Sequence, residues 1–194
     1  PPGGRTVRLS VRGDEEGVAV GPLIDSRAFE KVSGHVEDAL EKGARVRVGG
    51  GRRSGEGFDG GYFFEPTVLT ACGDDMLLAR EETFGPVIAI ASFESEEQVL
   101  SEANGTPYGL AAYLFTRDTQ RVKRCLDELH FGHVAVNSGT GPIPEAPFGG
   151  MKQSGFGREG GGEGRVRGGV RPQSLSLTPP PDAAGQDSWI LDNA

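Results

Sequence analysis

The stretch EETFGPV at 81–87 places two carboxylates, an aromatic ring and a Gly-Pro turn directly before an apolar run. A carboxylate can accept hydrogen bonds from the hydroxyls of a diol, and an aromatic side chain offers a flat apolar face to a ring. One of the two glutamates together with Phe84 could therefore bind a ribose and its nicotinamide. The same residues also fit a helix end with solvated glutamates and a core phenylalanine, and both readings stay open.

A second candidate is the glycine-rich loop APFGGMKQSGFGRE at 146–159, whose composition is typical of a segment with a backbone that closely approaches another group. Residues 155–160 spell GxGxxG. The dinucleotide fingerprint needs a buried strand before it, a helix after it and an acidic residue about 20 positions further on. Here GGMKQS precedes the motif and more glycine follows, so we do not assign a Rossmann-type site to it.

Neither cysteine has the sequence surroundings of a nucleophile. Cys125 belongs to the apolar stripe of a predicted helix, and Cys72 precedes Asp74 and Asp75, two anions that would raise a thiol pKa. The histidines show no metal-ligand spacing with the cysteines, and we expect them to be packing or surface residues: His35, His130 and His133. We therefore predict no catalytic residue and no metal ligand in this chain.

The composition narrows the class of partner. With 194 residues, one domain with tails is expected. The formal charge of −8 and the absence of a Lys/Arg block argue against a nucleic-acid partner. No apolar run approaches the roughly 20 residues of a membrane span, which argues against a membrane partner. Two cysteines without a disulfide framework indicate reduced thiols, so we predict a cytoplasmic location.

Periodicity predicts the elements that position these residues. Asp25 can cap a helix that Lys42-Gly43 closes, with one apolar face made by Phe29, Val32, Val36, Ala39 and Leu40. Asp74 and Asp75 start a short helix toward Glu81. Longer helices follow the capping box at 95–98 and Asp118. Strands are predicted at 45–48, 87–91, 110–115 and 134–137. The apolar run at 87–91 is expected to be buried on both faces. The segment at 62–69 is expected to be an edge strand or a bend, because it contains Pro66.

Alternation of helices with short apolar strands predicts the α/β class, with a parallel sheet covered by helices. Residues 1–15 form a poorly ordered lead-in, and 16–160 form the folded part. Residues 161–194 are rich in glycine and proline and offer little apolar surface, so we expect a disordered tail there.

Six motifs, taken in order, resemble the aldehyde dehydrogenase superfamily. They are VGPLI at 20–24, GYFFEPTV at 61–68, EETFGPV at 81–87, Asn104 with YGLAA at 108–112, VAVN at 134–137 and PFGGMKQSG at 147–155. The resemblance covers about residues 15 to 164, and the version at 146–155 looks most like the NAD(P)-dependent succinate-semialdehyde dehydrogenase branch. It implies that 16–160 is a fragment of an aldehyde dehydrogenase catalytic domain.

The resemblance also implies roles for individual residues. Glu82 matches the glutamate that holds the nicotinamide ribose, and Phe84 matches the aromatic beside the nicotinamide of NAD or NADP. Asn137 and Phe148 fall on loops that line the substrate tunnel. In that family a cysteine thiolate attacks the aldehyde, hydride passes to NAD(P)+, and a glutamate-activated water releases the acid.

Departures from the family pattern limit what the resemblance implies. The family's nucleophilic cysteine, general base and cofactor domain precede the position of Val20, and this chain contains none of them. The family is homo-oligomeric, but RVRGGVRP at 165–172 replaces its oligomerisation strand, and prolines 142 and 144 stand where a polar residue often meets the substrate carboxylate. We therefore expect an aldehyde dehydrogenase piece that does not turn over alone. The alternatives are an interaction module or degenerate gene product that associates with a complete subunit, and a nucleotide binder that uses the GxGxxG stretch.

Overall fold

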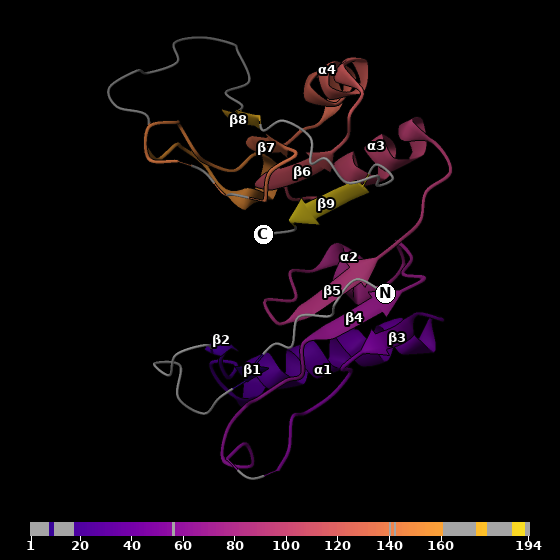
Figure 1. Cartoon of the computed structure of the whole chain (residues 1–194), viewed down its shortest axis with the longest axis vertical. Helices are drawn as coiled ribbons and strands as arrows, with labels where there is room; N and C mark the ends of the chain where they lie inside the picture. Colours follow the sequence, from indigo (N-terminus) through magenta and orange to yellow (C-terminus); the bar gives the residue numbers. More distant parts are fainter. Residues whose placement is uncertain are drawn as a thin grey trace. The chain divides into compact units, whose positions relative to one another are not determined.

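A computed structural model of the chain describes residues 8–9, 18–55, 57–139, 141, 143–160, 174–177 and 188–192. These residues fall into two compact units, Pro1–Ser92 and Phe93–Ala194. Figure 1 shows both, and each is described by itself. The α/β class is confirmed, because each unit combines helices with a sheet that contains parallel strand pairs. The expectation of a single folded region over 16–160 stays a prediction.

The first unit is built on the predicted amphipathic helix α1, Ser26–Glu41. The Asp25 carboxylate caps it by accepting a hydrogen bond of 2.8 Å from the Ala28 N–H. At the other end Gly43, with φ of 101°, makes the left-handed turn that glycine allows. The predicted apolar stripe is confirmed at Val32, Val36 and Ala39, which are buried. Leu40 is the exception, because it lies at the edge of the stripe and is 41% exposed.

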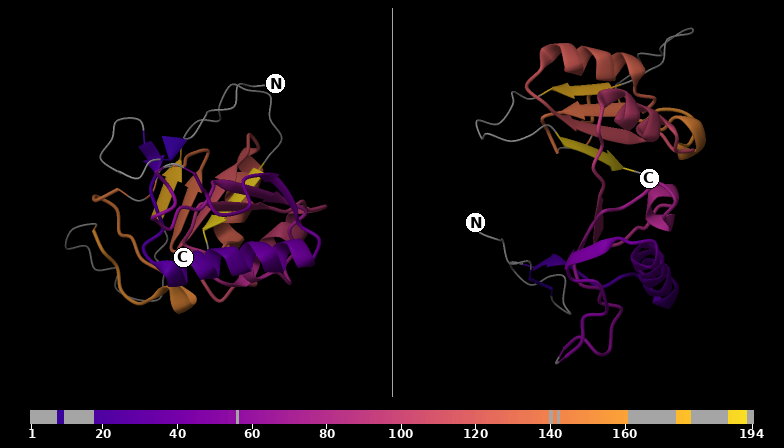
Figure 2. Two further views of the ribbon diagram at one scale, coloured as in Figure 1. Left: turned by 90° about the horizontal axis from the view of Figure 1, so that it is seen from below. Right: turned by 90° about the vertical axis from the view of Figure 1, so that its right-hand side faces the viewer.

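Helix α1 packs on one face of a three-stranded sheet with the order β3-β4-β5, as Figure 2 shows. The strands are β3 at Arg45–Val48, β4 at Thr67–Thr70 and β5 at Val87–Ile90. Strands β3 and β4 are antiparallel, whereas β4 and β5 are parallel. Leu69 of β4 and Val87 of β5 join the α1 residues in one apolar core.

Two strand predictions in this unit were wrong. The segment at 62–69 was expected to be an edge or a bend, but β4 begins at Thr67, after Pro66, and is the central strand of its sheet. Strand β5 was expected to be buried on both faces. It is instead an edge strand, with Ile88 61% and Ile90 47% exposed. These two side chains alternate with Val87, which packs toward α1, so they lie on the sheet face that α1 does not cover.

A short helix, α2 at Leu77–Arg80, precedes the 81–87 stretch. Asp74 and Asp75 were expected to start it, but no side chain of its own N-terminus caps it. The Leu77 N–H donates instead to the carboxylate of Asp38 on α1, at 2.8 Å. Lys42 hydrogen bonds to Asp38 and, together with the Leu77 N–H, holds the pKa of that carboxyl below its usual value. The start of α2 is therefore fixed by a residue 39 positions earlier in the chain.

The second unit has a sheet with the order β8-β7-β6-β9. Strands β6 at Ala111–Phe115 and β7 at His133–Val136 are parallel and largely buried, which confirms both predicted strands. Helices α3 at Glu96–Asn104 and α4 at Thr119–Glu128 contribute to one apolar core with alternate residues of β6 and β7. The predicted caps are also confirmed, since Ser95 accepts from the Gln98 N–H and Asp118 from the Gln120 N–H.

Four described segments fall in or next to the regions expected to be poorly ordered. Strand β1 at Arg8–Leu9 pairs with β2 at Val18–Val20. In the tail, β8 at Ser174–Leu177 runs parallel to β7, and β9 at Ser188–Asp192 runs antiparallel to β6. The disorder expected for most of 161–194 and the poor order expected for 1–15 stay predictions. The remaining residues of 1–15 and 161–194 lie outside the described residues.

None of the helices that the structure describes has the length and apolar character needed to cross a membrane. A cytoplasmic location stays a prediction.

Candidate cofactor-binding site

Glu82 and Phe84, the two residues selected from the sequence as cofactor-binding, are both accessible to solvent in the 81–87 loop. Glu82 is half-buried, and its carboxylate makes no hydrogen bond or ion pair with the described residues. The Phe84 side chain is 80% exposed. The loop thus presents a carboxylate without a partner among the described residues and, two positions later, an exposed aromatic ring.

The alternative interpretation of 81–87, a helix end with solvated glutamates and a core phenylalanine, is correct for the helix end and wrong for the phenylalanine. Helix α2 does end here, because the Glu81 N–H closes it with a hydrogen bond of 2.8 Å to the Leu77 carbonyl. The glutamates are solvent-accessible, as expected of a helix end. Phe84, however, is not a core phenylalanine. Leaving a large ring exposed in an ordered loop forgoes about 1.5–3 kcal/mol of burial.

The backbone of Phe84 is strained in the same place. Its φ of 50° is in the left-handed region, which costs an L-residue about 1–2 kcal/mol. In the described part of the chain the other non-glycine residues with positive φ are Ala71, Asn137 and Lys152. Phe84 and Asn137 were both selected from the sequence as site residues. Strain of this kind persists where the surroundings hold it, and it gathers at functional sites.

Three contacts hold the loop against the rest of its unit. Gly85 packs so closely on α1 that an added Cβ would lie 2.5 Å from Val32 Cγ2. The buried Thr67 of β4 donates its N–H to the Pro86 carbonyl at 2.8 Å. His35 of α1, which is 3% exposed, places Nδ1 3.1 Å from Thr83 Oγ1. The loop is therefore fixed from both α1 and β4.

The part played by His35 was missed from the sequence. It was expected to be a surface or packing histidine, and it is indeed buried. Its ring also hydrogen bonds to Thr83 of the loop, and its Nε2 lies 3.5 Å from the Glu81 carboxylate. One signal could have found it. His35 lies between Val32 and Val36 on the apolar stripe of α1, so its ring had to meet whatever that stripe packs against.

The two predicted substrate-tunnel residues belong to the second unit. Asn137 follows β7 and uses its side chain structurally, because Oδ1 accepts from the Thr116 N–H at 2.9 Å and Nδ2 donates to the Thr116 carbonyl at 3.0 Å. Phe148 is half-buried and meets the ring of His133 edge-on, at 6.2 Å between centroids. Phe148 also exchanges both backbone hydrogen bonds with Glu159. A substrate contact by either residue stays a prediction.

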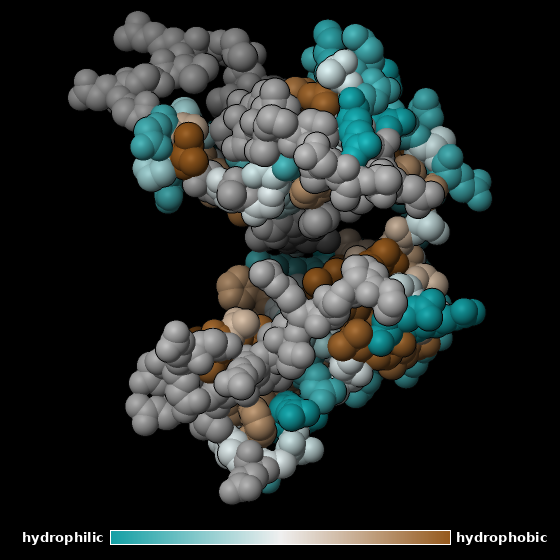
Figure 3. All heavy atoms as spheres, viewed as in Figure 1, coloured by the Kyte–Doolittle hydropathy of each residue, from teal (hydrophilic) through white to brown (hydrophobic). Residues whose placement is uncertain are grey.

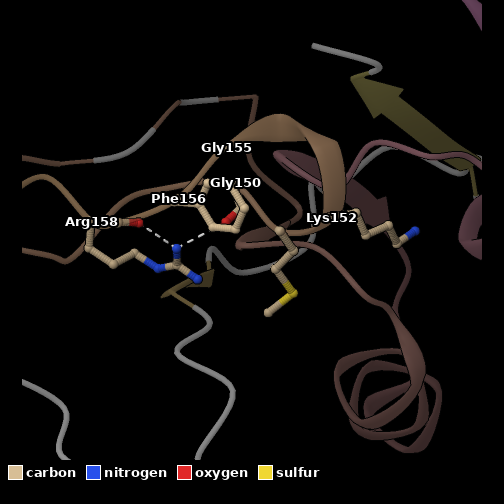
Figure 4. Close-up of a pocket in the computed structure, with 7 residues that line it drawn as sticks. Gly150, Lys152, Gly155, Phe156 and Arg158 are labelled. Carbon is tan, nitrogen blue, oxygen red and sulfur yellow. Dashed lines mark hydrogen bonds between the residues drawn. The ribbon is translucent and has the colours of Figure 1, made fainter.

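The glycine-rich loop lines an open pocket of about 340 Å³. Figure 4 shows the Arg158 guanidinium turned toward Gly150, while the Lys152 amine points away from it. Arg158 donates to the carbonyls of Gly150 and Gly157 at 2.9 and 2.6 Å. Phe156 is fully exposed. Residues 152–154 form a 3₁₀ turn, η1 at Lys152–Ser154, so no strand leads into GxGxxG, as predicted.

Lys152 has a structural role that the sequence did not reveal. Its amine donates to the carbonyls of Asn104 and Thr106 at 3.1 Å, at the C-terminal end of α3. A cation there interacts favourably with the helix dipole and with carbonyls that lack intrahelical partners. Burial lowers the pKa of Lys152. The loop is thereby fastened to α3.

Neither thiol is activated. Burial raises the pKa of the Cys125 thiol to about 12, and Cys125 is fully buried in the core of the second unit. Burial also raises the pKa of Cys72. The predicted direction for Cys72 was correct, but the cause is desolvation rather than Asp74 and Asp75. Within the described ranges, no three His, Cys, Asp or Glu side chains are grouped so that they could hold a metal ion.

Parallel strand pairs covered by helices place the chain among the α/β proteins. Residues 5–166 match the model of the aldehyde dehydrogenase family, and the chain belongs to that family.

Individual relatives agree with this assignment. The chain is 51% identical over 148 residues to the 3-sulfolactaldehyde dehydrogenase of Pseudomonas putida, a match that covers 76% of this chain and 30% of that protein. It is 49% identical over 160 residues to a probable NADP(+) succinate-semialdehyde dehydrogenase of Sinorhizobium fredii, which covers 82% of this chain and 32% of the relative. The chain thus spans about a third of the length of the relatives it matches.

Solved structures give the same result. The succinate-semialdehyde dehydrogenase of Burkholderia pseudomallei superposes with a TM-score of 0.71 at 51% identity, over 79% of this chain and 31% of that one. A betaine aldehyde dehydrogenase from Staphylococcus aureus in complex with NAD+ superposes with a TM-score of 0.75 at 37% identity, over 81% of this chain and 32% of that one. The predicted fragment of an aldehyde dehydrogenase catalytic domain is therefore confirmed as a fold.

Proposed function

We propose that this chain forms the nicotinamide-facing part of the NAD(P)+ site of an aldehyde-oxidising enzyme. Glu82 accepts hydrogen bonds from the ribose hydroxyls, and Phe84 flanks the nicotinamide ring. The observation that carries the proposal is the 80% exposure of Phe84 on a left-handed backbone. A ring held outward at a cost in both burial and strain is suited to packing on another ring.

The residues present suit the cofactor in charge and in shape. An ionised carboxylate is an acceptor with two oxygens, which matches the two donors of a ribose diol, and Glu82 has no competing partner among the described residues. Bound NAD(P)+ supplies the acceptor for a hydride. The contribution of this chain is to hold the ribose and to orient the ring, which is a positioning effect.

The proposed substrate class is an aldehyde with an anionic group at its far end. The names of the relatives that are 49–51% identical specify succinate semialdehyde and 3-sulfolactaldehyde, which carry a carboxylate and a sulfonate. We propose that Asn137 and Phe148 lie along the path of this substrate. A titration of the 15N-labelled chain with succinate should shift the amide resonance of Phe148, whereas betaine should not. Equal responses to both would contradict the substrate class.

The cofactor role is tested with nicotinamide mononucleotide, which contains only the ring, its ribose and one phosphate. Binding should shift the amide resonances of residues 82–85 and should weaken about tenfold in Glu82→Gln, the loss expected for a hydrogen bond to a charged acceptor. Glu30→Gln is the matched control, because Glu30 is an exposed glutamate on α1 of the same unit. An unchanged affinity in Glu82→Gln would contradict the assignment.

We also propose that the 194-residue chain does not oxidise aldehydes by itself. Cys72 and Cys125 are the cysteines available, and both thiols have raised pKa values. Orientation and electrostatic effects do not replace a nucleophile. The purified chain, supplied with succinate semialdehyde and NAD(P)+, should form no NAD(P)H. Turnover that survives Cys72→Ala and Cys125→Ala would contradict this.

The second candidate is an interaction module that associates with a complete aldehyde dehydrogenase subunit. It is favoured by β5, whose outer edge pairs with no other described strand and whose exposed Ile88 and Ile90 offer apolar surface to another chain. Figure 3 shows apolar surface over this unit. Size-exclusion chromatography of the chain mixed with a full-length relative tests the candidate. Elution of the two as separate species would exclude it.

A further inference from the structure

The 81–87 loop must be held by something specific, because its conformation is costly. Phe84 is strained and exposed, and Glu82 beside it has no partner among the described residues. A strained loop persists only when neighbouring groups over-determine it. Gly85 and Pro86 are anchored to Val32 and Thr67, C-terminal to Phe84. The N-terminal side of Phe84 therefore needs its own anchor.

His35 supplies that anchor. Its ring is 3% exposed, and its Nδ1 is 3.1 Å from the hydroxyl of Thr83, the residue between Glu82 and Phe84. The other ring nitrogen, Nε2, lies 3.5 Å from the Glu81 carboxylate. An ionised carboxylate only accepts hydrogen bonds, so of the two neutral tautomers it favours the one with the proton on Nε2. Nδ1 then accepts a hydrogen bond from the Thr83 hydroxyl.

We propose that His35 is a positioning residue for the cofactor site: by holding Thr83 it fixes Phe84 in its left-handed conformation and sets the direction of Glu82. The identity of the ligand in this proposal rests on the proposed function. The effect of His35 on the conformation of the loop does not. A part-buried hydrogen bond between residues 48 positions apart defines one loop geometry, whereas apolar packing alone would tolerate several. His35 itself does not touch the cofactor.

The test uses two pairs of variants of the full chain. Thr83→Val removes the hydroxyl at nearly constant shape, and Thr83→Ser keeps it. His35→Leu removes the ring nitrogens, and His35→Asn keeps a carbonyl oxygen able to accept from Thr83. The readouts are the amide shifts and hydrogen exchange of residues 83–85 and the affinity for nicotinamide mononucleotide. Because Thr83 is only half-buried, its variants keep the test available should His35→Leu fail to fold.

Thr83→Val and His35→Leu should each shift the amides of residues 83–85, speed their exchange and weaken nicotinamide mononucleotide about tenfold. Thr83→Ser and His35→Asn should stay within about twofold of the parent chain. The double variant should be no weaker than either single one, because both remove the same bond. A His35 that only fills space would give similar losses in His35→Asn and none in Thr83→Val.

Two outcomes separate this inference from the proposed function. Normal amide shifts and exchange in Thr83→Val and His35→Leu would overturn the positioning role, whatever the ligand does. Failure of the parent chain to bind nicotinamide mononucleotide would overturn the proposed cofactor role of Glu82 and Phe84. The amide readout would then still decide whether His35 fixes the loop.

Discussion

At the scale of single residues, the site combines an available charge with an unfavourable conformation. Glu82 is half-buried without a partner among the described residues, and Phe84 is exposed at φ of 50°. Both features lower stability and neither is needed to end α2, which the Glu81 N–H already closes. A functional origin therefore explains them better than a role in folding.

The strain at Phe84 can be measured by comparing Phe84→Gly with Phe84→Ala. Both variants remove the exposed ring, but only glycine is at ease in the left-handed region. After allowance for the greater freedom of glycine in the unfolded chain, Phe84→Gly should be more stable than Phe84→Ala by about 0.5–1 kcal/mol. Urea denaturation gives the difference. A more stable alanine variant would mean that the backbone is not left-handed in solution.

At the scale of elements, α1 organises the first unit. Its cap is local, but its other contacts reach far along the chain: Asp38 caps α2, Val32 receives Gly85 and His35 bonds to Thr83. In the second unit α3 and α4 are joined by charge, because Glu96 pairs with Arg121 at 2.8 Å and with Arg124 at 2.6 Å. These contacts convert predictable helices into a defined tertiary arrangement.

The close packing between the loop and α1 predicts the effect of Gly85→Ala. The new Cβ would lie 2.5 Å from Val32 Cγ2, and Val32 is fully buried with little room to move. Overpacking of this kind should lower the free energy of unfolding by about 1–3 kcal/mol.

The same substitution in a Val32→Ala background provides the control. Removing the clashing methyl groups should make Gly85→Ala less costly there than in the parent chain. Equal costs in both backgrounds would show that the loop does not rest on Val32.

The ion pairs of Glu96 predict a pH-dependent stability. Hydrogen bonds from Arg124, and then from Arg121, lower the pKa of Glu96 from 4.5 to about 2. A depressed folded-state pKa contributes stability above pH 4.5, and this contribution is lost as the pH falls from there toward 2. Glu96→Gln should therefore cost about 1 kcal/mol at pH 7, after discounting for solvent screening, and progressively less below pH 4.5.

Glu97→Gln is the matched control, because Glu97 is an exposed neighbour in the same first turn of α3. Denaturation at several pH values compares the two variants. A cost of Glu96→Gln that does not change with pH would contradict the ion-pair account.

At the scale of the whole molecule, hydrophobic periodicity predicted most of the fold. Helices α1, α3 and α4 and strands β3, β6 and β7 came from local signals, namely caps and apolar spacing. The exposure of β5 could not be predicted in this way. Its sequence is apolar on both faces, and its burial depends on which other segments lie beside it. The family motifs identified Glu82 and Phe84, but His35 and Lys152 act through contacts between distant segments, which periodicity does not encode.

A chain that spans about a third of its relatives should recognise only part of the cofactor. Nicotinamide mononucleotide should bind, whereas adenosine monophosphate should not, because the GxGxxG stretch is preceded by the 3₁₀ turn η1 and not by the buried strand that a dinucleotide site requires. Parallel titrations followed by amide shifts compare the two. Preferential binding of adenosine monophosphate at residues 155–160 would support the nucleotide-binder alternative instead.

The most direct test of the central claim is the nuclear Overhauser effect between nicotinamide mononucleotide and the ring of Phe84. The account predicts cross-peaks between the nicotinamide protons and the Phe84 ring protons in the parent chain. It also predicts that Glu82→Gln weakens them at equal ligand concentration. Bound ligand with cross-peaks to Phe148 or Phe156 and none to Phe84 would contradict the assignment of the nicotinamide site to the 81–87 loop.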